Sequence, residues 1–372
     1  MIGKIIKQPT GYSAFIPDKF PPKFDIPMDQ EMLNLQYWAT HYLAKLDGIT
    51  QLLPDVDLFT FMYIRKEAAL SSQIEGTKAT MIDAIEAEGT TTEGLPEDVY
   101  QIQKYIEAMN YGLKRIETLP LSLRLIREVH KILLSDPKDN RFTPGEFRRS
   151  QNWIGGDTIE TAKFVPPPVD AMHKALDDFE KFLYLEDYFT PLIKTGIAHA
   201  QFETIHPFLD GNGRTGRLLI TFYFVKQGVL EKPVLYISEY FKKHRQTYFD
   251  LLYNYHIKGD VVPWLKFFLE GIAQTAKDAI EASRKITKLR EEDIEKIQSL
   301  GQTAKIGTLI LKNLYKLPIV DVNKISEWSG YTRQGAYKLI DRFVELRILE
   351  QKDISQEYGK KYVYKKYLDI FA

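Results

Sequence analysis

Helical spacing of apolar side chains runs through most of this 372-residue chain and constrains its fold more than any other feature. From Asp29 onward, Leu33, Tyr37 and Leu43 recur with a period near 3.6, which predicts an amphipathic helix. Further helices are expected at 58–74, 80–88, 97–114, 121–134, 168–185, 191–204, 214–228, 238–257 and 260–282. The sequence therefore predicts a mainly α fold, a helical bundle in which each helix buries one face against its neighbours.

Two stretches interrupt this helical pattern. Prolines exclude a regular helix from the first 27 residues, so an extended arm lying on the folded body is expected there. These prolines are Pro9, Pro17, Pro21, Pro22 and Pro27. Residues 145–167 carry Gly155 and Gly156 between short apolar segments, a pattern that predicts two short strands joined as a β-hairpin.

The C-terminal part has its own pattern. The charge-rich stretch 284–298 is expected to form a solvated connecting helix. Helices at 303–316, at 321–329 and from Thr332 precede a two-stranded ribbon, the element order of a winged helix-turn-helix. The length suits two or three domains. They are predicted at 1–115 for the N-terminal arm and helical region, 116–285 for a central domain, and 286–372 for the linker helix and winged helix.

Composition excludes several classes of function. The chain has no cysteine, so disulfides, thiolate catalysis and cysteine-ligated zinc are excluded. Lysine plus arginine and aspartate plus glutamate both number 50, so the overall charge indicates no particular partner. The N-terminal residues lack the apolar run of a signal peptide, and no stretch approaches about 18 uninterrupted apolar residues. A cytoplasmic protein that does not enter membranes is expected.

The segment from His206 to Arg217, HPFLDGNGRTGR, concentrates reactive side chains. His206 has an unperturbed pKa near neutrality, so it suits a general base. Asp210 supplies the hard oxygen ligand that a phosphate-bound Mg²⁺ prefers. A base and a metal ligand this close together indicate a site for chemistry on a nucleotide.

The rest of this segment suits phosphate binding. Gly211, Asn212 and Gly213 allow successive backbone N–H groups to point into one anion-binding nest. A helix beginning near Arg214 adds its positive N-terminal dipole. Arg214 and Arg217 are three residues apart on that helix, so both can meet one polyphosphate.

Three other interpretations of the glycines are weaker. Gly211 to Gly216 satisfies G-x-G-x-x-G, with Glu231 near the position of a ribose-binding acid, but the preceding residues keep helical spacing where a dinucleotide fold needs a strand. The P-loop pattern lacks its final Gly-Lys-Ser/Thr. A glycine loop that only caps a buried helix, with His206 a core histidine, would not need two arginines and an aspartate.

The same segment resembles the signature of the Fic family, H-P-F-x-[D/E]-G-N-G-R-x-x-R, at all nine defined positions. The resemblance extends over roughly residues 30–285 and implies a Fic-type helical fold and a protein adenylyltransferase. His206 would deprotonate a Ser, Thr or Tyr hydroxyl of a target protein, which attacks the α-phosphorus of ATP. Asp210 would hold Mg²⁺. ATP and its phosphates would be bound by Gly211, Asn212, Gly213, Arg214, Thr215, Gly216 and Arg217.

An upstream segment resembles the inhibitory motif of Fic proteins, [S/T]-x-x-x-E-[G/N]. It comprises Ser71 to Gly76, and Glu75 lies one helical turn beyond Ser71. The resemblance implies that Glu75 pairs with Arg217 where the γ-phosphate would bind. Because the motif precedes the catalytic signature, it implies the class with an N-terminal inhibitory helix.

The resemblance also suggests roles outside these two motifs. The hairpin at 145–167 stands where Fic proteins carry a flap that binds the target backbone by strand addition, with Ile154 and Phe164 as the candidate flap residues. It could equally be a structural hairpin that closes the core. Tyr240, His244 and Tyr248 are four apart, so they could line an adenine slot on one helix face, or the two tyrosines could be ordinary core. Similar proteins often have Asn at the position of His244.

The terminal module has a net charge of +5 over residues 301–372, from 13 basic and 8 acidic residues. Thr332 suits a helix N-cap, and the residues after it could present a polar face to a DNA groove. These are Arg333, Gln334, Tyr337, Lys338 and Arg342. Lysines at 360, 361, 365 and 366 suit phosphate contacts. DNA binding and protein contact both remain open for this module.

Three alternatives to adenylylation remain. The enzyme could transfer another nucleotide, or remove AMP from a modified target. A DNA-binding transcriptional regulator could use the Fic-like domain only as an ATP sensor, although a sensor would not need His206. A homodimer and self-modification are both compatible with the sequence.

Overall fold

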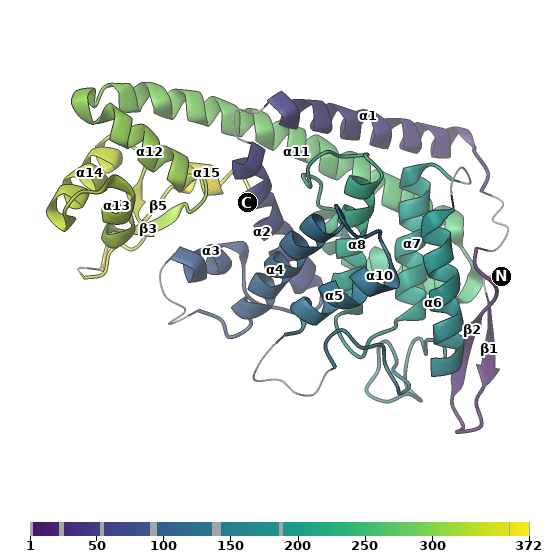
Figure 1. The fold of residues 1–372 in the computed structure, drawn as a ribbon. Coiled ribbons are helices and arrows are strands. Elements are labelled where there is room, and N and C mark those ends of the chain that lie inside the picture. The colour runs from purple at the N-terminus through teal and green to yellow at the C-terminus, as the bar shows by residue number, and fades with distance from the viewer. Residues whose placement is uncertain are drawn as a thin grey trace.

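Two buried helices form the centre of the molecule. The computed structural model describes residues 3–21, 26–52, 56–89, 95–135, 143–185, 189–356 and 358–371. Helices α7 (Pro191–Ile205) and α8 (Asn212–Lys226) are buried on almost every face. A helix that is buried on all sides needs other elements packed around it. In Figure 1 the remaining helices of the body lie around this pair.

The surrounding helices from α1 to α6 agree closely with the predicted ranges, whereas α9, α10 and α11 have other boundaries. They are α1 (Gln30–Leu52), α2 (Val56–Ile74), α3 (Met81–Gly89), α4 (Val99–Arg115), α5 (Leu123–Leu133), α6 (Val169–Tyr184), α9 (Ser238–Lys243), α10 (Arg245–Lys258) and α11 (Val261–Gln298). The predicted mainly helical fold is therefore confirmed. No helix among the described residues is both long enough and apolar enough to span a membrane.

The N-terminal arm is more regular than predicted. It is extended, but it forms an antiparallel hairpin of β1 (Gly3–Lys7) and β2 (Ser13–Pro17), with Gly3 opposite Pro17. Backbone N–H of Phe15 donates to the carbonyl of Val165, 2.9 Å away, which attaches the hairpin to the body. The prolines excluded a helix but not a strand, since they stand at the strand end or beyond it. Pro22 lies outside the described residues.

The predicted hairpin at 145–167 is much less regular. The structure has a single bridge between Ile154 and Phe164 and no continuous strand in this stretch. Gly155 and Gly156 both have positive φ, so the glycine turn is present. The prediction of two strands was wrong because side-chain and backbone contacts to the helical body replace ladder hydrogen bonds.

Two predicted helix boundaries also differ. The helix expected at 238–257 is divided at His244, where φ is −110° and ψ is 38°, into α9 and α10. The helices expected at 260–282 and 284–298 are one continuous helix, α11. The predicted domain boundary after residue 285 falls inside this helix.

The C-terminal residues form a small module on the end of α11. It contains a 3₁₀ turn (Gly301–Thr303), α12 (Ala304–Leu314), β3 (Ile319–Asp321), α13 (Val322–Ser329), α14 (Arg333–Glu345), β4 (Glu350–Gln351), β5 (Lys361–Val363) and α15 (Lys365–Leu368). The ribbon has three antiparallel strands in the order β3-β5-β4, one more than predicted. Figure 1 shows α11 running from the helical body to this module.

The module also contacts the N-terminal helices. The carboxylate of Glu86 on α3 pairs with Lys361 at 2.8 Å and with Lys352. On α2, the ring of Tyr63 packs edge-on against Phe371 with 5.4 Å between centroids. These contacts attach the C-terminal module to α2 and α3.

Candidate active site

The candidate base lies at a strained position between the two central helices. His206 is the C-cap of α7 and has a left-handed backbone with φ of 48°. A non-glycine residue rarely adopts this conformation, and such strain persists only where neighbours hold it. The imidazole is largely buried, with 18% of its side chain exposed.

Two side chains that sequence reasoning missed hold His206 in place. Nε of buried Arg148 donates to the His206 carbonyl at 3.0 Å, and Nδ2 of Asn152 donates to the same oxygen at 3.2 Å. Arg148 also donates to the carbonyls of Ser150 and Pro167. A buried arginine that only meets carbonyls is a structural clamp, and it ties residues 148–167 to the catalytic loop. No local spacing reveals it, because these contacts join residues far apart in the chain.

The loop from Phe208 to Asn212 is closed by its own atoms. The Asn212 amide accepts from Phe208 N–H at 2.9 Å and donates to the Phe208 carbonyl at 2.8 Å. Gly211 is left-handed with φ of 75° and precedes the first residue of α8. The side chain of Asn212 therefore shapes the loop, and the backbone N–H groups at the helix N-terminus are what remain for an anion.

His130 on α5 supports the same loop and was also missed. Its ring stacks on Phe208 with 3.6 Å between centroids and 6° between planes. Nδ1 accepts from Gly145 N–H at 2.9 Å, so Nε2 carries the proton and donates to the Asp210 carbonyl at 3.0 Å. Burial lowers the pKa of His130 to about 4, which keeps it neutral at pH 7.

Asp210, the predicted metal ligand, has an exposed carboxylate. It pairs with Arg214 at 3.1 Å, and 42% of its side chain is exposed. Among the described residues no three histidines or carboxylates gather closely enough to hold a metal alone. Mg²⁺ commonly takes one or two carboxylates together with substrate phosphates, so a single exposed aspartate beside a phosphate site fits that ion.

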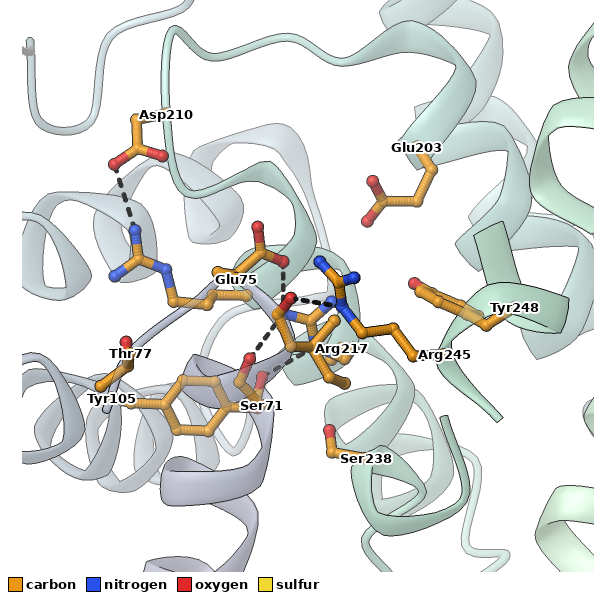
Figure 2. Close-up of polar contacts among 12 residues, drawn as sticks. Ser71, Glu75, Thr77, Tyr105, Glu203, Asp210, Arg217, Ser238, Arg245 and Tyr248 are labelled. Carbon is orange, nitrogen blue, oxygen red and sulfur yellow. Dashed lines mark hydrogen bonds and ion pairs between the residues drawn. The ribbon is translucent and has the colours of Figure 1, made fainter. Parts of the chain in front are cut away.

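The two predicted motifs meet through Arg217. Its Nη2 lies 2.7 Å from Oε1 of Glu75, and its Nε donates to Oγ of Ser71 at 2.8 Å. A further bond joins Nη2 to the Ser71 carbonyl at 3.0 Å. Figure 2 shows Glu75, Ser71 and Arg217 converging in this way. Glu75 lies one residue after the end of α2, in a turn, and not on the helix itself.

The Glu75 carboxylate lies against the N-terminus of α8. A Cβ added at Gly213 would be 2.2 Å from Oε1 of Glu75 and 2.9 Å from Nη1 of Arg217, so only glycine permits this approach. Burial raises the pKa of Glu75, but the charge and hydrogen bond of Arg217 lower it further, and it ends below the ordinary value. A negative charge therefore occupies the anion-binding end of α8.

The pKa values of His206 and Glu203 are displaced in opposite directions. Burial, aided by the charge of Arg148, lowers the pKa of His206 to about 4, so the imidazole is neutral at pH 7. Burial raises the pKa of Glu203 to about 8 despite the nearby Arg217. Oε2 of Glu203 is 3.8 Å from Nδ1 of His206. Glu203, three residues before His206, was not singled out from the sequence.

The proposed aromatic slot is only partly assembled. Tyr240 and His244 lie together, with 4.5 Å between ring centroids. Tyr248 does not share their face, because the chain breaks at His244. It is buried, stacks on Phe241 at 4.4 Å and has its hydroxyl 2.9 Å from Nε2 of His199. The expectation that all three line one surface was wrong.

The remaining predicted residues lie close to this centre. Thr215 and Gly216 are buried in the first turns of α8, and an added Cβ at Gly216 would be 2.5 Å from Oε1 of Glu203. Ile154 and Phe164 pair with each other through backbone hydrogen bonds of 2.8 and 3.1 Å. Phe164 also stacks on His256, with 4.6 Å between centroids.

Family models agree with this arrangement. Residues 34–114 match the Fic/DOC family N-terminal model, and residues 120–224 match the Fic/DOC family model. Together they take in half of the chain, including α2 with Ser71 and the whole segment from His206 to Arg217. The chain belongs to the Fic/DOC family.

Relatives and solved structures point the same way. The chain is 33% identical over 159 residues to the protein adenylyltransferase Fic of Aedes aegypti, covering 42% of this chain and 28% of that protein. Its counterpart in Drosophila melanogaster is 30% identical over 176 residues, 46% of this chain and 31% of the relative. The matched region is thus less than a third of these curated relatives.

Two solved structures share the fold. A Fic family protein from Desulfovibrio desulfuricans superposes with a TM-score of 0.60 at 19% identity, covering 93% of this chain and 98% of that one. A Fic domain-containing signalling protein from Bacteroides thetaiotaomicron superposes with a TM-score of 0.55 at 20% identity, covering 66% of this chain and 97% of that one.

Proposed function

We propose that this protein is an autoinhibited adenylyltransferase that moves AMP from ATP to a Ser, Thr or Tyr hydroxyl of a target protein, including itself. The observation that carries the proposal is the Glu75 carboxylate held at the N-terminus of α8 by Arg217. An anion already occupies the position that a nucleotide phosphate would need. The adenylyltransferase relatives support the reaction class.

In this reaction Nε2 of His206 accepts the proton of the target hydroxyl. The hydroxyl oxygen bonds to the α-phosphorus, the bond from that phosphorus to the bridging oxygen breaks, and pyrophosphate leaves with the electron pair. The lowered pKa of His206 supports a neutral, unprotonated base at pH 7. Backbone N–H groups of Gly211 to Gly213, with Arg214 and Arg217, would hold the phosphates.

Asp210 would hold Mg²⁺ together with the ATP phosphates, and the ion would neutralise charge on them. The 3.1 Å pair with Arg214 keeps the Asp210 carboxylate at the edge of the phosphate site. Tyr240 and His244 would lie against the adenine. Residues 145–167, with Ile154 and Phe164, would bind the target backbone as a flap.

Glu75 would inhibit by competing for Arg217. With Ser71 and Glu75 bound to it, Arg217 cannot also neutralise the terminal phosphate, so ATP would bind with its α-phosphate out of line. Replacing Glu75 frees one N–H of Arg217 Nη2, which still donates to the Ser71 carbonyl, and it removes a negative charge. We expect a gain of about 5–150-fold, the range of typical coupling between two sites.

The test uses ATP labelled at the α-phosphate, with Mg²⁺ and cell lysate, and compares wild type, Glu75→Gly and His206→Ala. We expect strong label on protein with Glu75→Gly, weaker label with wild type and none with His206→Ala. If protein took label from ATP labelled at the γ-phosphate and none from ATP labelled at the α-phosphate, the reaction would be phosphoryl transfer. Absence of label on every variant would overturn adenylylation and favour another nucleotide, removal of AMP, or an ATP sensor.

For residues 286–372 we propose a linker and a winged helix that contacts DNA or protein. The order α12, β3, α13, α14, β4, β5 supports the winged helix. Thr332 caps α14 by accepting from Gly335 N–H, and its polar residues Arg333, Gln334 and Lys338 are exposed. Lys361, however, is paired with Glu86. Binding of random duplex DNA that weakens steeply with salt would favour the DNA role.

We also propose a homodimer through α1. Exposed apolar side chains gather on this helix, where Tyr37 is 59% exposed and Trp38 is 46% exposed. Their rings pack on one another, with 5.1 Å between centroids. Sedimentation of wild type and Trp38→Glu would separate a dimer from a monomer.

A further inference from the structure

A buried carboxyl group lies directly behind the candidate base. Glu203 is on the last turn of α7, with 8% of its side chain exposed, and its Oε2 is 3.8 Å from Nδ1 of His206. Both Nδ1 of His206 and Oε1 of Glu203 are buried and have no hydrogen-bond partner among the described residues. Burying two such polar groups is costly unless a partner is found in some state of the site.

The fold keeps room for this carboxyl. A Cβ at Gly216 would meet Oε1 of Glu203 at 2.5 Å, so the glycine on α8 lets the side chain lie beside the base. The Fic signature leaves this position free, since it is one of the two variable residues between Arg214 and Arg217. Gly216 is therefore explained by Glu203 and not by the phosphates.

From this geometry we infer that Glu203 is a positioning residue, which binds Nδ1 of His206 and so directs Nε2 at the acceptor hydroxyl. The inference rests on the proposed adenylyl transfer. Closing 3.8 Å to a hydrogen bond needs a shift below about 1 Å, and catalytic hydrogen bonds are often long before substrate binds. With Nδ1–H donated to Oε2, the lone pair is on Nε2.

This bond also assists the proton transfer. When Nε2 takes the hydroxyl proton, the ring becomes an imidazolium cation, and a carboxylate at Nδ1 stabilises it. The proton later leaves Nε2 to solvent. Glu203 changes no bond of the substrate; it holds the ring and its tautomer.

Other titratable groups face the pair from every surrounding element. They are His199 on α7, Arg217 on α8, Glu75 after α2, Tyr248 and His256 on α10, Arg148 in the segment 145–167 and Asp210 in the loop. Burial lowers the pKa of His199 and of His256 to about 3, and it raises that of Tyr248 far above neutrality. Burial raises the pKa of Glu203 to about 8, so this carboxyl changes its charge close to neutral pH.

The experiment compares Glu75→Gly with Glu75→Gly/Glu203→Gln, from pH 6 to 9, by the rate of labelling from α-labelled ATP. We expect the rate at saturating ATP to fall at least about tenfold, since general base catalysis contributes 10²–10⁴-fold, while KM for ATP changes less than about twofold. In Glu75→Gly the rate should rise around pH 8, where Glu203 loses its proton. In Glu75→Gly/Glu203→Gln this rise should be absent. Glu203→Asp, which keeps the charge, should retain part of that rise.

Glu180→Gln serves as the matched control. Glu180 is a half-buried carboxylate on α6 that accepts from Leu123 N–H at 2.8 Å, away from the loop. Equal rates and equal pH profiles for Glu75→Gly and Glu75→Gly/Glu203→Gln would overturn the inference. If Glu75→Gly itself takes no label, the adenylyl transfer is overturned instead.

A second readout needs no activity. In full-length protein with ¹⁵N-labelled histidine, the ring signals of His206, assigned by their loss in His206→Ala, should shift around pH 8. The shift should be absent in Glu203→Gln. An unchanged titration would show that Glu203 does not bind the ring and would sink the inference whatever the reaction is.

Discussion

Arg217 is the side chain that, in the proposed function, both binds the phosphates of ATP and holds the inhibitory Glu75. Its guanidinium is buried, and it is bound by Oγ and the carbonyl of Ser71 as well as by Glu75. Burial would lower its pKa, but Glu75 raises it above the ordinary value, so the pair remains charged. Each bond that holds Arg217 toward α2 is one it cannot give to a phosphate.

Ser71→Ala should therefore relieve part of the inhibition. The substitution removes the 2.8 Å hydrogen bond to Nε of Arg217 but leaves Glu75 in place. One such bond stabilises the inhibited arrangement by about 1 kcal/mol, so we expect the labelling rate to rise about fivefold. The adjacent Ser72 is a matched control because it is also buried and its hydroxyl has no partner among the described residues. Labelling by Ser72→Ala should equal wild type; a gain there as large as in Ser71→Ala would contradict the role of the Arg217 bond.

Glu203 should also make the free energy of unfolding depend on pH. A glutamate in the unfolded chain has a pKa near its ordinary value of 4.5, whereas burial in the fold raises the pKa of Glu203 to about 8. Between these values the folded state holds a proton that the unfolded state has lost. Stability should then fall as pH rises from about 4.5 to 8, by up to about 1.4 kcal/mol per pH unit. Urea unfolding of wild type and Glu203→Gln at pH 5.5 and 8 measures this, and parallel curves would refute it.

At the scale of elements, the segment 148–167 and the loop that begins at His206 are joined mainly through the side chain of Arg148. Arg148 donates to carbonyls of His206, Ser150 and Pro167. Asn152 adds bonds to the carbonyls of His206 and Phe208. The two segments are therefore held together as one unit, although they are separate in sequence.

Arg148→Lys should loosen that unit. One ammonium cannot reach three carbonyls, so we expect a loss of about 3 kcal/mol in unfolding free energy and a large drop in labelling. Arg149→Lys is the matched control, because Arg149 is 86% exposed and pairs only with Glu146 in the contacts of the described residues. Thermal melts and label counts of the two variants should differ clearly. Equal behaviour would mean that the clamp is dispensable.

At the scale of the whole molecule, the C-terminal module is attached to the helices that precede the catalytic motif. Glu86 on α3 binds Lys352 and Lys361, and Tyr63 on α2 meets Phe371. Tyr364 donates to Asp293 on α11 at 2.6 Å. Helix α2 therefore contacts the module at Tyr63 and carries Ser71 in its last turn.

Glu86→Ala should release the module from α3. Burial raises the pKa of Glu86, but the two lysines lower it below the ordinary value, so the carboxylate is charged and paired. Its loss leaves the partly exposed ammonium groups of Lys352 and Lys361 without this partner. We expect the free energy that holds the module to α3 to fall by about 1–2 kcal/mol. Amide hydrogen exchange in α3 and in 350–363 should then quicken about tenfold. Glu345→Ala, on exposed α14, should leave both segments unchanged.

The sequence by itself determined the helical body and the segment that concentrates reactive side chains. Helical periodicity is local, and the motif from His206 to Arg217 places base, glycines and arginines within one loop and helix start, so neighbours in sequence are neighbours in space. The pairing of Glu75 with Arg217 was also predictable, but only through the family resemblance, since it joins α2 to α8.

Only the tertiary structure decided what surrounds that motif. Arg148, His130 and Glu203 have no distinctive spacing, and their roles arise from contacts that close long loops of chain. The same holds for the break at His244, which moved Tyr248 into the core, and for the continuity of α11 across its charged stretch. Packing against other elements fixes such features, and the free energy of a long-range contact cannot be read from the residues beside it.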